Sequence, residues 1–355
     1  MLFSEEIIAW YHRHKRDLPW RHTSDPYVIW LSEIILQQTR VEQGLPYFQR
    51  FIEMFPNVRL LAEADEGTVL RLWEGLGYYS RARNMHQTAK MVMENFEGVF
   101  PSRFDQLITL KGIGEYTAAA ISSFSANEAK AVVDGNVFRV LARYFGDGTP
   151  INSTKGKKIF GQLANELLDS KNPAIHNQAL MEFGALQCRP KNPCCEICPL
   201  FLGCVARKEN KVPLLPVKRK GGKSKNRFFY YFIIREGDKL ALRKRGPKDI
   251  WENMYEFPMI EHTEALSLDQ LKKLPIFVDW FGEKATLTVL SKPPKHLLSH
   301  QQIFATFIQV EDIAPNDNKK DLWNYVFTKD LDTLAKPKLI FTFIRDYIIC
   351  TTNTL

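Results

Sequence analysis

Residues 110–118 read LKGIGEYTA, a Gly-x-Gly turn that joins two helical patterns. The upstream pattern carries Phe104 and Leu107, and the downstream pattern is rich in alanine. Gly112 and Gly114 would let backbone N–H groups come close to a phosphate, where a helix N-terminus adds partial positive charge. Such a contact positions DNA without reading its sequence. By itself the motif is weak evidence, because the same turn can simply connect two packed helices.

The composition of the 355-residue chain is that of a folded protein with room for two domains. Hydrophobic residues make up 45% and charged residues 25%, which excludes a disordered or fibrous chain. Lys and Arg number 48 against 40 Asp and Glu, a net charge of +8. A basic excess favours a polyanionic partner such as nucleic acid, but a generically basic protein explains it equally well. The charge therefore does not decide the function.

The N-terminal segment 1–20 mixes acidic and basic residues without an apolar run, so it reads as neither a signal peptide nor a membrane anchor. No later stretch is long and apolar enough for a membrane span. We expect a cytoplasmic protein without a membrane partner, in which thiols stay reduced. Five of the six cysteines lie between Cys188 and Cys204, and such crowding indicates metal binding rather than disulfides.

Apolar residues recur at helical spacing through the first part of the chain, as at Val28, Leu31 and Ile35. Residues 211–227 combine prolines, a Gly-Gly pair and many basic residues, which predicts an exposed linker. The pattern then becomes mixed, with a predicted hairpin of strands 228–235 and 239–245, further strands at 285–290 and 303–310, and helices at 267–274 and 341–349. We therefore predict an all-α domain over 1–210 followed by a smaller α+β domain over 228–355.

A frame of four cysteines closes the helical half of the chain: Cys188-x6-Cys195-x2-Cys198-x5-Cys204. Four thiolates this close in sequence can hold an iron–sulfur cluster or a single metal ion. Zinc usually takes two separated Cys-x2–4-Cys pairs, whereas this segment has one such pair. Structural zinc stays the alternative to a cluster. Cys194 is a spare thiol beside the frame.

Two acidic residues lie beside apolar runs. Asp134 follows AVV (131–133) and precedes Gly135, a position typical of a helix cap. Glu33 lies within WLSEIILQQTR (30–40), on a predicted helix. A buried Glu is either held by structural partners or has a raised pKa suited to donating a proton. From the residues alone, a structural role is the simpler interpretation of each.

Together these motifs resemble the endonuclease III superfamily of helix-hairpin-helix DNA glycosylases. The hairpin would span 103–125, and the segment 188–204 resembles the loop that holds a [4Fe–4S] cluster in that superfamily, with Cys188, Cys195, Cys198 and Cys204 as ligands. The stretch SEIILQQT (32–39) resembles the adenine DNA glycosylase family. The resemblance spans nearly the whole chain and is stronger in the helical half.

The resemblance implies an enzyme that flips adenine out of double-stranded DNA, opposite 8-oxoguanine or guanine, and hydrolyses its N-glycosidic bond. Glu33 would protonate the adenine, and Asp134 would stabilise the oxocarbenium-like sugar. Asn136 would assist by hydrogen bonding, and Tyr116 would lie near the reacting sugar. A monovalent cation at carbonyl groups of the hairpin is also implied. We expect the enzyme to act as a monomer.

The same resemblance assigns residues to the DNA and to the base pocket. Tyr78, on the Gly-flanked turn of LWEGLGYYSRAR (72–83), would act as a wedge, and Gln38 would insert near the lesion. Without the resemblance, Tyr78 and Tyr79 would read as core aromatics at a helix junction. Gly112 and Gly114 would hold a phosphate. The remaining assignments, to the pocket and to DNA contact, are Arg16, Trp20, Leu36, Gln37, Thr39 and Gln178.

Strand-cleaving members of the superfamily carry a lysine at the position of Tyr116. A tyrosine cannot form the required imine, so we expect a monofunctional glycosylase. One alternative is an endonuclease III-like glycosylase and AP lyase for oxidised pyrimidines, against which Tyr116 and Glu33 count. Another is a non-catalytic DNA-binding protein with a structural metal, which requires Glu33 and Asp134 to be spectators.

The second domain resembles the Nudix-like domain of the family through WENMYEFP (251–258). It lacks the Glu-rich box that would bind catalytic magnesium, so we expect recognition rather than hydrolysis. Leu298-Ser299-His300 lies where the family usually has Phe-Ser-His, the loop that senses oxidised guanine. Because Leu298 offers no flat ring, recognition would depend more on Ser299 and His300. Read alone, the Ser-His pair would indicate an ordinary polar turn.

Overall fold

The computed structural model describes residues 3–219, 221–222, 224–298, 300–313 and 322–349. Backbone contacts divide the chain into two compact units, one of Met1–Ala64 with Asn84–Lys220 and the other of Asp65–Arg83 with Gly221–Leu355. None of the helices in the described part of the chain has the length and apolar character needed to cross a membrane. The predicted ranges 1–210 and 228–355 stay a prediction for how the chain divides into separately folding domains.

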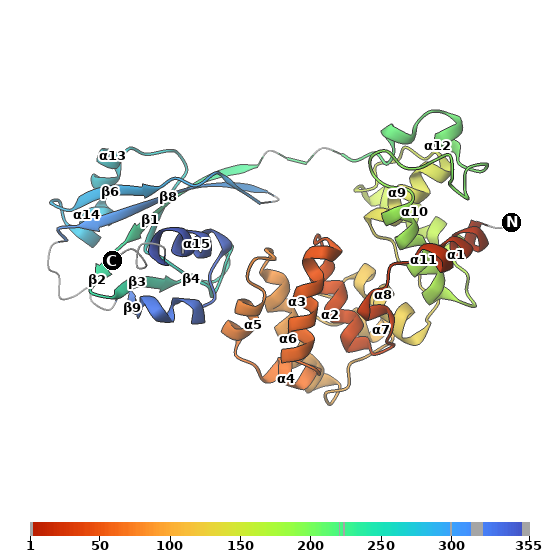
Figure 1. Cartoon of the computed structure of the whole chain (residues 1–355), viewed down its shortest axis with the longest axis horizontal. Coiled ribbons are helices and arrows are strands. Elements are labelled where there is room, and N and C mark those ends of the chain that lie inside the picture. The colour runs from red at the N-terminus through yellow and green to blue at the C-terminus, as the bar shows by residue number, and fades with distance from the viewer. Residues whose placement is uncertain (1–2, 220, 223, 299, 314–321, 350–355) are drawn as a thin grey trace. The chain divides into compact units, whose positions relative to one another are not determined.

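The first unit is built from helices, as the apolar periodicity predicts (Figure 1). Its α-helices are α1 Phe3–His14, α2 Pro26–Leu36, α3 Val41–Met54, α4 Val58–Glu63, α6 Ser80–Asn95, α7 Phe104–Leu107, α8 Glu115–Ala126, α9 Gly135–Phe145, α10 Thr154–Leu167, α11 Pro173–Leu186 and α12 Val205–Lys208. Short 3-10 helices lie at Pro19–Arg21 and Val212–Leu214. Helix α6 begins within the second unit and continues in the first.

Helix α2 is the interior helix of the first unit. It begins where the Asp25 carboxylate accepts the N–H of Tyr27 at 2.8 Å, with Pro26 in the first turn. Buried residues follow almost without interruption from Tyr27 to Ile35. A helix that is apolar nearly all round lies inside the protein rather than on its surface. Glu33 is therefore carried into the interior by its neighbours.

Helices α9 and α11 pack closely together. The core beside them includes Val137, Val140 and Phe183. At the crossing, Gly184 of α11 lies so near α9 that an added Cβ would be 2.7 Å from the Cβ of Asn136 and 2.9 Å from its carbonyl oxygen. Only glycine permits this approach without moving the backbone of α9.

The second unit is a mixed α+β structure. One sheet contains β1 Lys225–Ile233, β5 Met259–His262, β6 Thr286–Ser291, β7 His296–Leu297 and β8 Gln301–Glu311, in the order β5-β1-β8-β6 with β7 also on β8. A smaller sheet contains β2 Arg235–Glu236, β3 Lys239–Lys244, β4 Tyr255–Glu256 and β9 Asn324–Phe327. The helices are α5 Glu66–Leu72, α13 Leu268–Lys272, α14 Pro275–Phe281 and α15 Lys338–Phe343, with a 3-10 helix at Thr328–Thr333 and a π-helix at Ile344–Ile349.

Strands β1 and β8 pair in parallel and form the centre of the larger sheet. On one face Phe232 contacts Phe281 of α14, with ring centroids 5.0 Å apart. On the other face Phe307 stacks on Phe343 of α15 at 4.0 Å (Figure 1). Because both faces are covered, β1 reads as a continuous apolar run rather than an alternating one.

The predicted hairpin of 228–235 with 239–245 is wrong in its first strand. Of the predicted first strand, only its end, which lies in the two-residue strand β2, pairs with β3, through Arg235↔Leu240 and Glu236↔Lys239. The longer strand β1 pairs instead with β5 and β8. The chain passes from one sheet to the other at Ile234, and a continuous apolar run gives no sign of such a change of partner. The strands at 285–290 and 303–310 correspond to β6 and β8.

Residues 65–83 group with the second unit, which no sequence pattern signals. The amide nitrogen of Asn253 donates to the Glu66 carboxylate at 2.8 Å. The Arg83 guanidinium donates to the carbonyl oxygen of Glu252 at 3.1 Å. The Glu74 carboxyl accepts the backbone N–H of Lys336. These contacts join α5 and the turn after it to the β-rich unit.

We expect Gly184→Ala to lower the free energy of unfolding by about 1–3 kcal/mol, because the new methyl group overlaps the α9 backbone. Gly161→Ala in α10 is the matched control, since no atom lies within 4 Å of its added Cβ. It should raise stability by about 0.5–1 kcal/mol through helix propensity alone. Urea denaturation followed by circular dichroism measures both, and equal midpoints would contradict the proposed close packing.

Candidate functional site

Glu33 is the buried acid of α2, with 9% of its surface exposed. Its Oε2 accepts a hydrogen bond of 2.8 Å from the hydroxyl of Tyr116. Tyr116 lies in the first turn of α8, directly after the Gly-x-Gly turn. The motif that opens α8 therefore also places a hydroxyl donor against the acid of α2.

Asp134 is the N-cap of α9. Its Oδ1 accepts the backbone N–H groups of Asn136 at 2.8 Å and Val137 at 2.7 Å, and its Oδ2 accepts the side-chain amide of Asn136 at 2.7 Å. The helix-cap interpretation of Asp134 is thus correct. The cap does not exclude a chemical role, because the carboxylate sits at the positive end of a helix dipole and faces a cavity.

Glu33, Tyr116, Asp134 and Asn136 line one cavity of about 190 Å³. They come from α2 and from the consecutive helices α8 and α9, which lie far from α2 in sequence. The other lining residues are Arg16, Leu18, Trp20, Arg21, Leu36, Gln37, Thr39, Val41, Met181, Glu182 and Ala185. The cavity thus combines three acidic residues, two arginines and several apolar side chains.

Burial raises the pKa of Glu33 to about 7. The hydrogen bond from Tyr116 opposes the rise, the nearby Asp134 adds to it, and Arg21 opposes it. Burial also raises the pKa of Asp134, and the N–H donors from Val137 and Asn136 oppose that rise. Near neutral pH a substantial fraction of Glu33 is therefore a neutral acid that can give up a proton.

Glu182 of α11 is a site residue that the sequence analysis missed. It has 1% exposure and binds two arginines: Arg16 through its Nε and Nη2 at 2.9 and 2.8 Å, and Arg21 through Nη1 and Nη2 at 3.1 and 2.7 Å. Burial would raise its pKa, but these charged donors outweigh burial and hold the pKa at about 2. The sequence held one sign of such a role: Glu182 is an acidic residue on a helix whose neighbouring residues are mostly buried.

Most residues assigned to the base pocket line this cavity, namely Arg16, Trp20, Leu36, Gln37 and Thr39. Gln178 is not among the lining residues; its Oε1 accepts the hydroxyl of Tyr11 at 2.6 Å. Gln38 is exposed and adopts a left-handed backbone conformation with φ +56°. It follows directly on Gln37, the residue that ends α2.

The Gly-x-Gly turn has the geometry that the motif requires. Gly112 has φ +77°, and a Cβ there would lie 2.9 Å from the Cβ of Asn84. Gly114 is the N-cap of α8 and has no atom within 4 Å of an added Cβ. The open space at the helix N-terminus leaves room for an anionic group to approach the backbone N–H groups.

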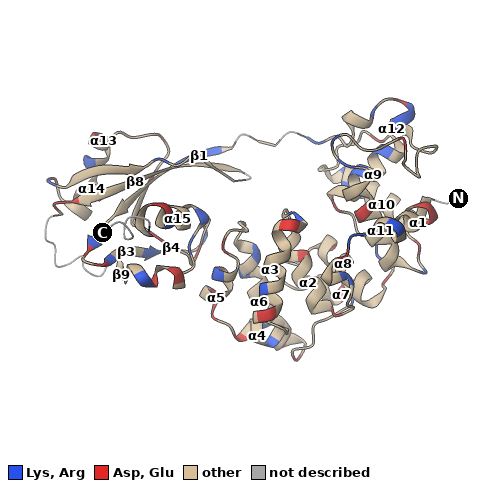
Figure 2. Ribbon diagram, viewed as in Figure 1, with Lys and Arg blue, Asp and Glu red and all other residues tan. Residues whose placement is uncertain are grey.

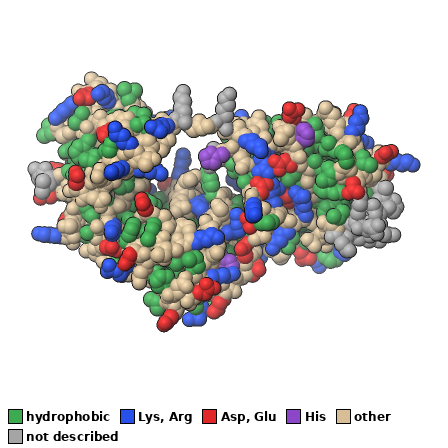
Figure 3. Space-filling model, turned by 180° about the vertical axis from the view of Figure 1, so that it is seen from behind, with side chains coloured by type: hydrophobic (Ala, Val, Ile, Leu, Met, Phe, Trp, Pro, Cys, Tyr) green, Lys and Arg blue, Asp and Glu red, His purple; other side chains and the backbone are tan. Residues whose placement is uncertain are grey.

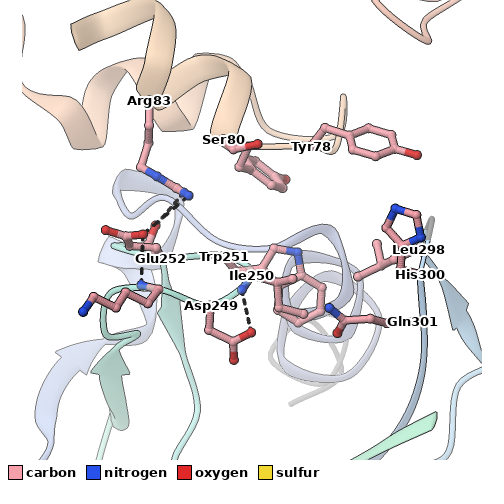
Figure 4. A pocket seen from close by; sticks show the side chains of 12 residues that line it. Tyr78, Ser80, Arg83, Asp249, Ile250, Trp251, Glu252, Leu298, His300 and Gln301 are labelled. Carbon is pink, nitrogen blue, oxygen red and sulfur yellow. Dashed lines mark hydrogen bonds and ion pairs between the residues drawn. The ribbon is translucent and has the colours of Figure 1, made fainter. Parts of the chain in front are cut away.

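A second cavity, of about 480 Å³, lies within the second unit (Figure 4). Tyr78, which is 45% exposed with φ +49°, lines it together with Leu298 and His300. The other lining residues are Tyr79, Ser80, Arg83, Lys248, Asp249, Ile250, Trp251, Glu252 and Gln301. The predicted residue Ser299 lies outside the described residues. The structure thus brings Tyr78, Leu298 and His300 to one cavity.

Cys188, Cys195, Cys198 and Cys204 line a common cavity with Cys194. Burial raises the pKa of Cys198 to about 12, and the other three thiols of the frame add to the rise, so the four groups are close enough to interact. The Arg143 guanidinium is 3.4 Å from the Cys188 sulfur and also donates to the carbonyl of Arg189. Among the described residues no group of three Cys, His, Asp or Glu is placed to hold one metal ion.

Basic residues lie on α9 and α12 (Figure 2), among them Arg143 and Arg207, which line the cavity of the cysteines. On the face shown in Figure 3, acidic and basic side chains are interspersed, so the net positive charge is not gathered into one patch there. Local geometry therefore identifies the site better than the charge does.

Two family models match the chain: the HhH-GPD superfamily base excision DNA repair protein over residues 31–166 and the NUDIX domain over residues 230–346. The adenine DNA glycosylase of Buchnera aphidicola subsp. Schizaphis graminum is 38% identical over 279 residues, 78% of this chain and 80% of the relative. That of Buchnera aphidicola subsp. Baizongia pistaciae is 35% identical over 335 residues, 91% of each chain. The solved structure of a thermostable thymine-DNA glycosylase matches with a TM-score of 0.55 and 29% identity, covering 58% of this chain and 95% of that one.

We expect Tyr116→Phe to move the pKa of Glu33 above its value of about 7, because the lost hydrogen bond lowers that pKa in the native protein. Carbon-13 NMR titration of glutamate carboxyls, with Glu33→Gln to assign the signal, measures the shift. Tyr27→Phe is the control: this tyrosine of α2 donates to the carbonyl of Phe55 at 2.7 Å and should leave Glu33 unchanged. A signal for Glu33 at the ordinary 4.5 would contradict the burial argument.

Proposed function

The chain belongs to the adenine DNA glycosylase family, and from this membership we propose that it removes adenine mispaired with 8-oxoguanine or guanine in double-stranded DNA. It is an enzyme of base excision repair that acts on N-glycosidic bonds. The observation that carries the proposal is the placement of Glu33 and Asp134 on one cavity, from helices that the sequence separates by a hundred residues.

Glu33 serves as the general acid in this proposal. Adenine leaves poorly as an anion, so a proton must reach the base as the bond to the sugar breaks. A carboxyl group with a pKa near 7 is protonated often enough at neutral pH and is still a strong enough acid to donate. Tyr116 holds this carboxyl through its hydroxyl and so fixes its direction.

Asp134 serves as the carboxylate that stabilises the cationic sugar. Its charged form is favoured by the N–H donors of Asn136 and Val137 and by the N-terminus of α9. One neutral acid and one carboxylate in different environments is the usual division of labour in glycosidic bond cleavage. Asn136 positions the carboxylate through its side-chain amide.

The reaction stops at base removal in this proposal. A lyase step needs an amine nucleophile, and Tyr116 stands where the strand-cleaving members have lysine. The described residues that line the cavity include arginines but no lysine. Lys111 of the hairpin turn bonds to Gln87 instead. These observations favour a monofunctional enzyme over the endonuclease III-like alternative.

The second unit serves to recognise the base opposite the adenine. Leu298 and His300 line the same cavity as Tyr78, the proposed wedge, so one pocket combines a residue suited to filling a gap in the duplex with the loop assigned to sensing the lesion. We further propose that a flipped adenine enters the Glu33 cavity while the partner base is read in this unit.

The cysteine frame is proposed to hold a [4Fe–4S] cluster. Its four thiols line a shared cavity, and the Arg143 guanidinium beside Cys188 opposes the rise in the pKa of that thiol that burial causes. The single Cys-x2-Cys pair in the frame favours a cluster, because structural zinc usually takes two separated pairs. The cluster would tie together the loop after α11 and the start of α12. A monovalent cation at the hairpin carbonyls, a monomeric state and a cytoplasmic location complete the proposal.

Glu33→Gln and Asp134→Asn should each slow adenine excision from an A:8-oxoguanine duplex by about 100- to 10,000-fold in single-turnover assays. The wild-type rate should fall as pH rises through about 7, because Glu33 then loses its proton. Strand breakage should require added alkali. Glu53→Gln, the same change at an exposed position of α3, should leave the rate unchanged.

Strand scission without alkali at an oxidised pyrimidine would favour the endonuclease III-like alternative. Full activity of both acid variants would make Glu33 and Asp134 spectators and would sink the catalytic assignment.

Cys198→Ser should abolish the visible charge-transfer absorption of the purified protein and lower its iron and sulfide content. Cys194→Ser, the adjacent thiol outside the spacing frame, should retain both. Metal analysis that found zinc without iron in the wild-type protein would support structural zinc instead.

A further inference from the structure

The loop Lys248–Asn253, which joins β3 to β4, has an unusual backbone. Lys248, Trp251 and Asn253 all adopt the left-handed conformation, with φ of +67°, +60° and +63°. None of them is glycine, and each such conformation costs free energy. A loop with this much local strain keeps its shape only when surrounding contacts fix it.

Asp249 supplies the main contact that fixes the loop to the sheet. Its carboxylate pairs with both terminal nitrogens of Arg227 on β1, at 2.8 and 2.7 Å, and with Arg245 after β3 at 2.5 Å. It also accepts the N–H of Ile250 at 2.7 Å. Both arginines are buried. Bidentate pairs of this kind fix geometry as well as charge.

The same arginine reaches the other wall of the cavity. Arg227 Nη1 donates to Oε1 of Gln301 at 2.8 Å, and Gln301 follows His300. Figure 4 shows His300 and Gln301 beside the loop and Tyr78 and Ser80 on the opposite side of the cavity from Asp249. Arg227 therefore connects the loop with Gln301, and both line the cavity.

The far end of the loop contacts the segment that carries Tyr78. Glu252 accepts from Arg83 through its carbonyl at 3.1 Å, and its carboxylate is 3.7 Å from the same guanidinium. Asn253 donates to Glu66 at 2.8 Å. The loop therefore spans from the buried arginines to the helices on either side of the Tyr78 turn.

We propose that Asp249 is a positioning residue for recognition of the base opposite adenine: it fixes the Lys248–Asn253 loop to Arg227 and Arg245, so that His300, Gln301 and the Tyr78 turn keep a single arrangement around the cavity. The inference rests on the proposed function of the second unit and adds to it the residues that make the site rigid. Asp249 also lines the cavity, but both of its carboxylate oxygens accept hydrogen bonds from Arg227, Arg245 or the N–H of Ile250, so the role that we assign to it is to hold the loop.

Glu261 of β5 offers a closely matched control. It pairs with the same arginine, through Nε and Nη2 of Arg227 at 2.6 Å each, and its side chain is 37% exposed against 36% for Asp249. It does not line the cavity and does not hold the loop. Arg227 keeps one carboxylate partner in either variant, so a difference between them reports on the loop.

The experiment compares Asp249→Asn with Glu261→Gln. Single-turnover adenine excision is measured on A:8-oxoguanine and A:G duplexes, and hydrogen exchange is measured for the backbone of residues 248–253. Asp249→Asn should reduce the preference for 8-oxoguanine over guanine roughly tenfold, the effect of losing one charged hydrogen-bonding contact, and should speed exchange in the loop. Glu261→Gln should change neither quantity.

Equal losses of preference in the two variants, or an unchanged preference in Asp249→Asn, would overturn the inference. So would slower excision from both duplexes by the same factor, since that marks general destabilisation. A wild-type protein that excises adenine without any preference would refute the proposed role of the second unit. In that case the hydrogen exchange of residues 248–253 decides what is left of the inference. Unchanged exchange in Asp249→Asn would also refute the anchoring of the loop. Faster exchange would show that Asp249 anchors the loop but has no role in recognition.

Discussion

The removal of Glu33 from water is the constraint on which the catalytic site depends. Helix α2 is apolar on nearly every side, so the one acid in its middle is carried into the interior with a single hydroxyl partner, Tyr116. Arg21 lies near enough to oppose the rise in the pKa of Glu33 but does not outweigh burial, and the carboxyl group relieves the cost of burial by binding a proton. The fold thus makes an acid that is neutral near pH 7, which is what protonation of a poor leaving group requires.

Glu182 shows how far the local partners decide the outcome. It lines the same cavity and is even more buried than Glu33, yet two arginine forks hold it ionised, with a pKa of about 2. Burial acts in the same direction on both acids. At Glu182, charge-assisted hydrogen bonds from two arginines outweigh the rise in pKa that burial causes. At Glu33, the hydrogen bond from the hydroxyl of Tyr116 does not outweigh it. Two glutamates in one cavity can therefore differ in charge, one holding arginines in place and one available to donate a proton.

The second unit uses buried charge for a different purpose. Arg227 and Arg245 are each paired with two carboxylates, and these ion pairs link strands and loops. Removing one partner of a buried ion pair costs far more free energy than the intact pair contributes to stability, because the other charge is left buried and unpaired. Arrangements in which a pair is broken are therefore strongly disfavoured, and the strands and loops that it links keep one geometry. The strained loop Lys248–Asn253 is held by this network. The proposed catalytic site and the proposed recognition site thus differ in how they accommodate buried acidic groups: Glu33 has no ion pair among the described residues, whereas Asp249 is paired with arginines.

The sequence alone determined the features that depend on residues within a few positions of one another. These are the helices of the first half, the Gly-x-Gly turn that opens α8, the helix cap at Asp134 and the spacing of the four cysteines. The sequence also indicated both acids through their resemblance to a family. Only the tertiary structure decided that Glu33 and Asp134 share a cavity, that Glu182 belongs to it, and that Gln178 does not line it. It likewise decided that β1 pairs with β8 rather than with β3, and that residues 65–83 join the second unit. These facts depend on which surfaces meet across long stretches of chain, and neither periodicity nor spacing carries that information.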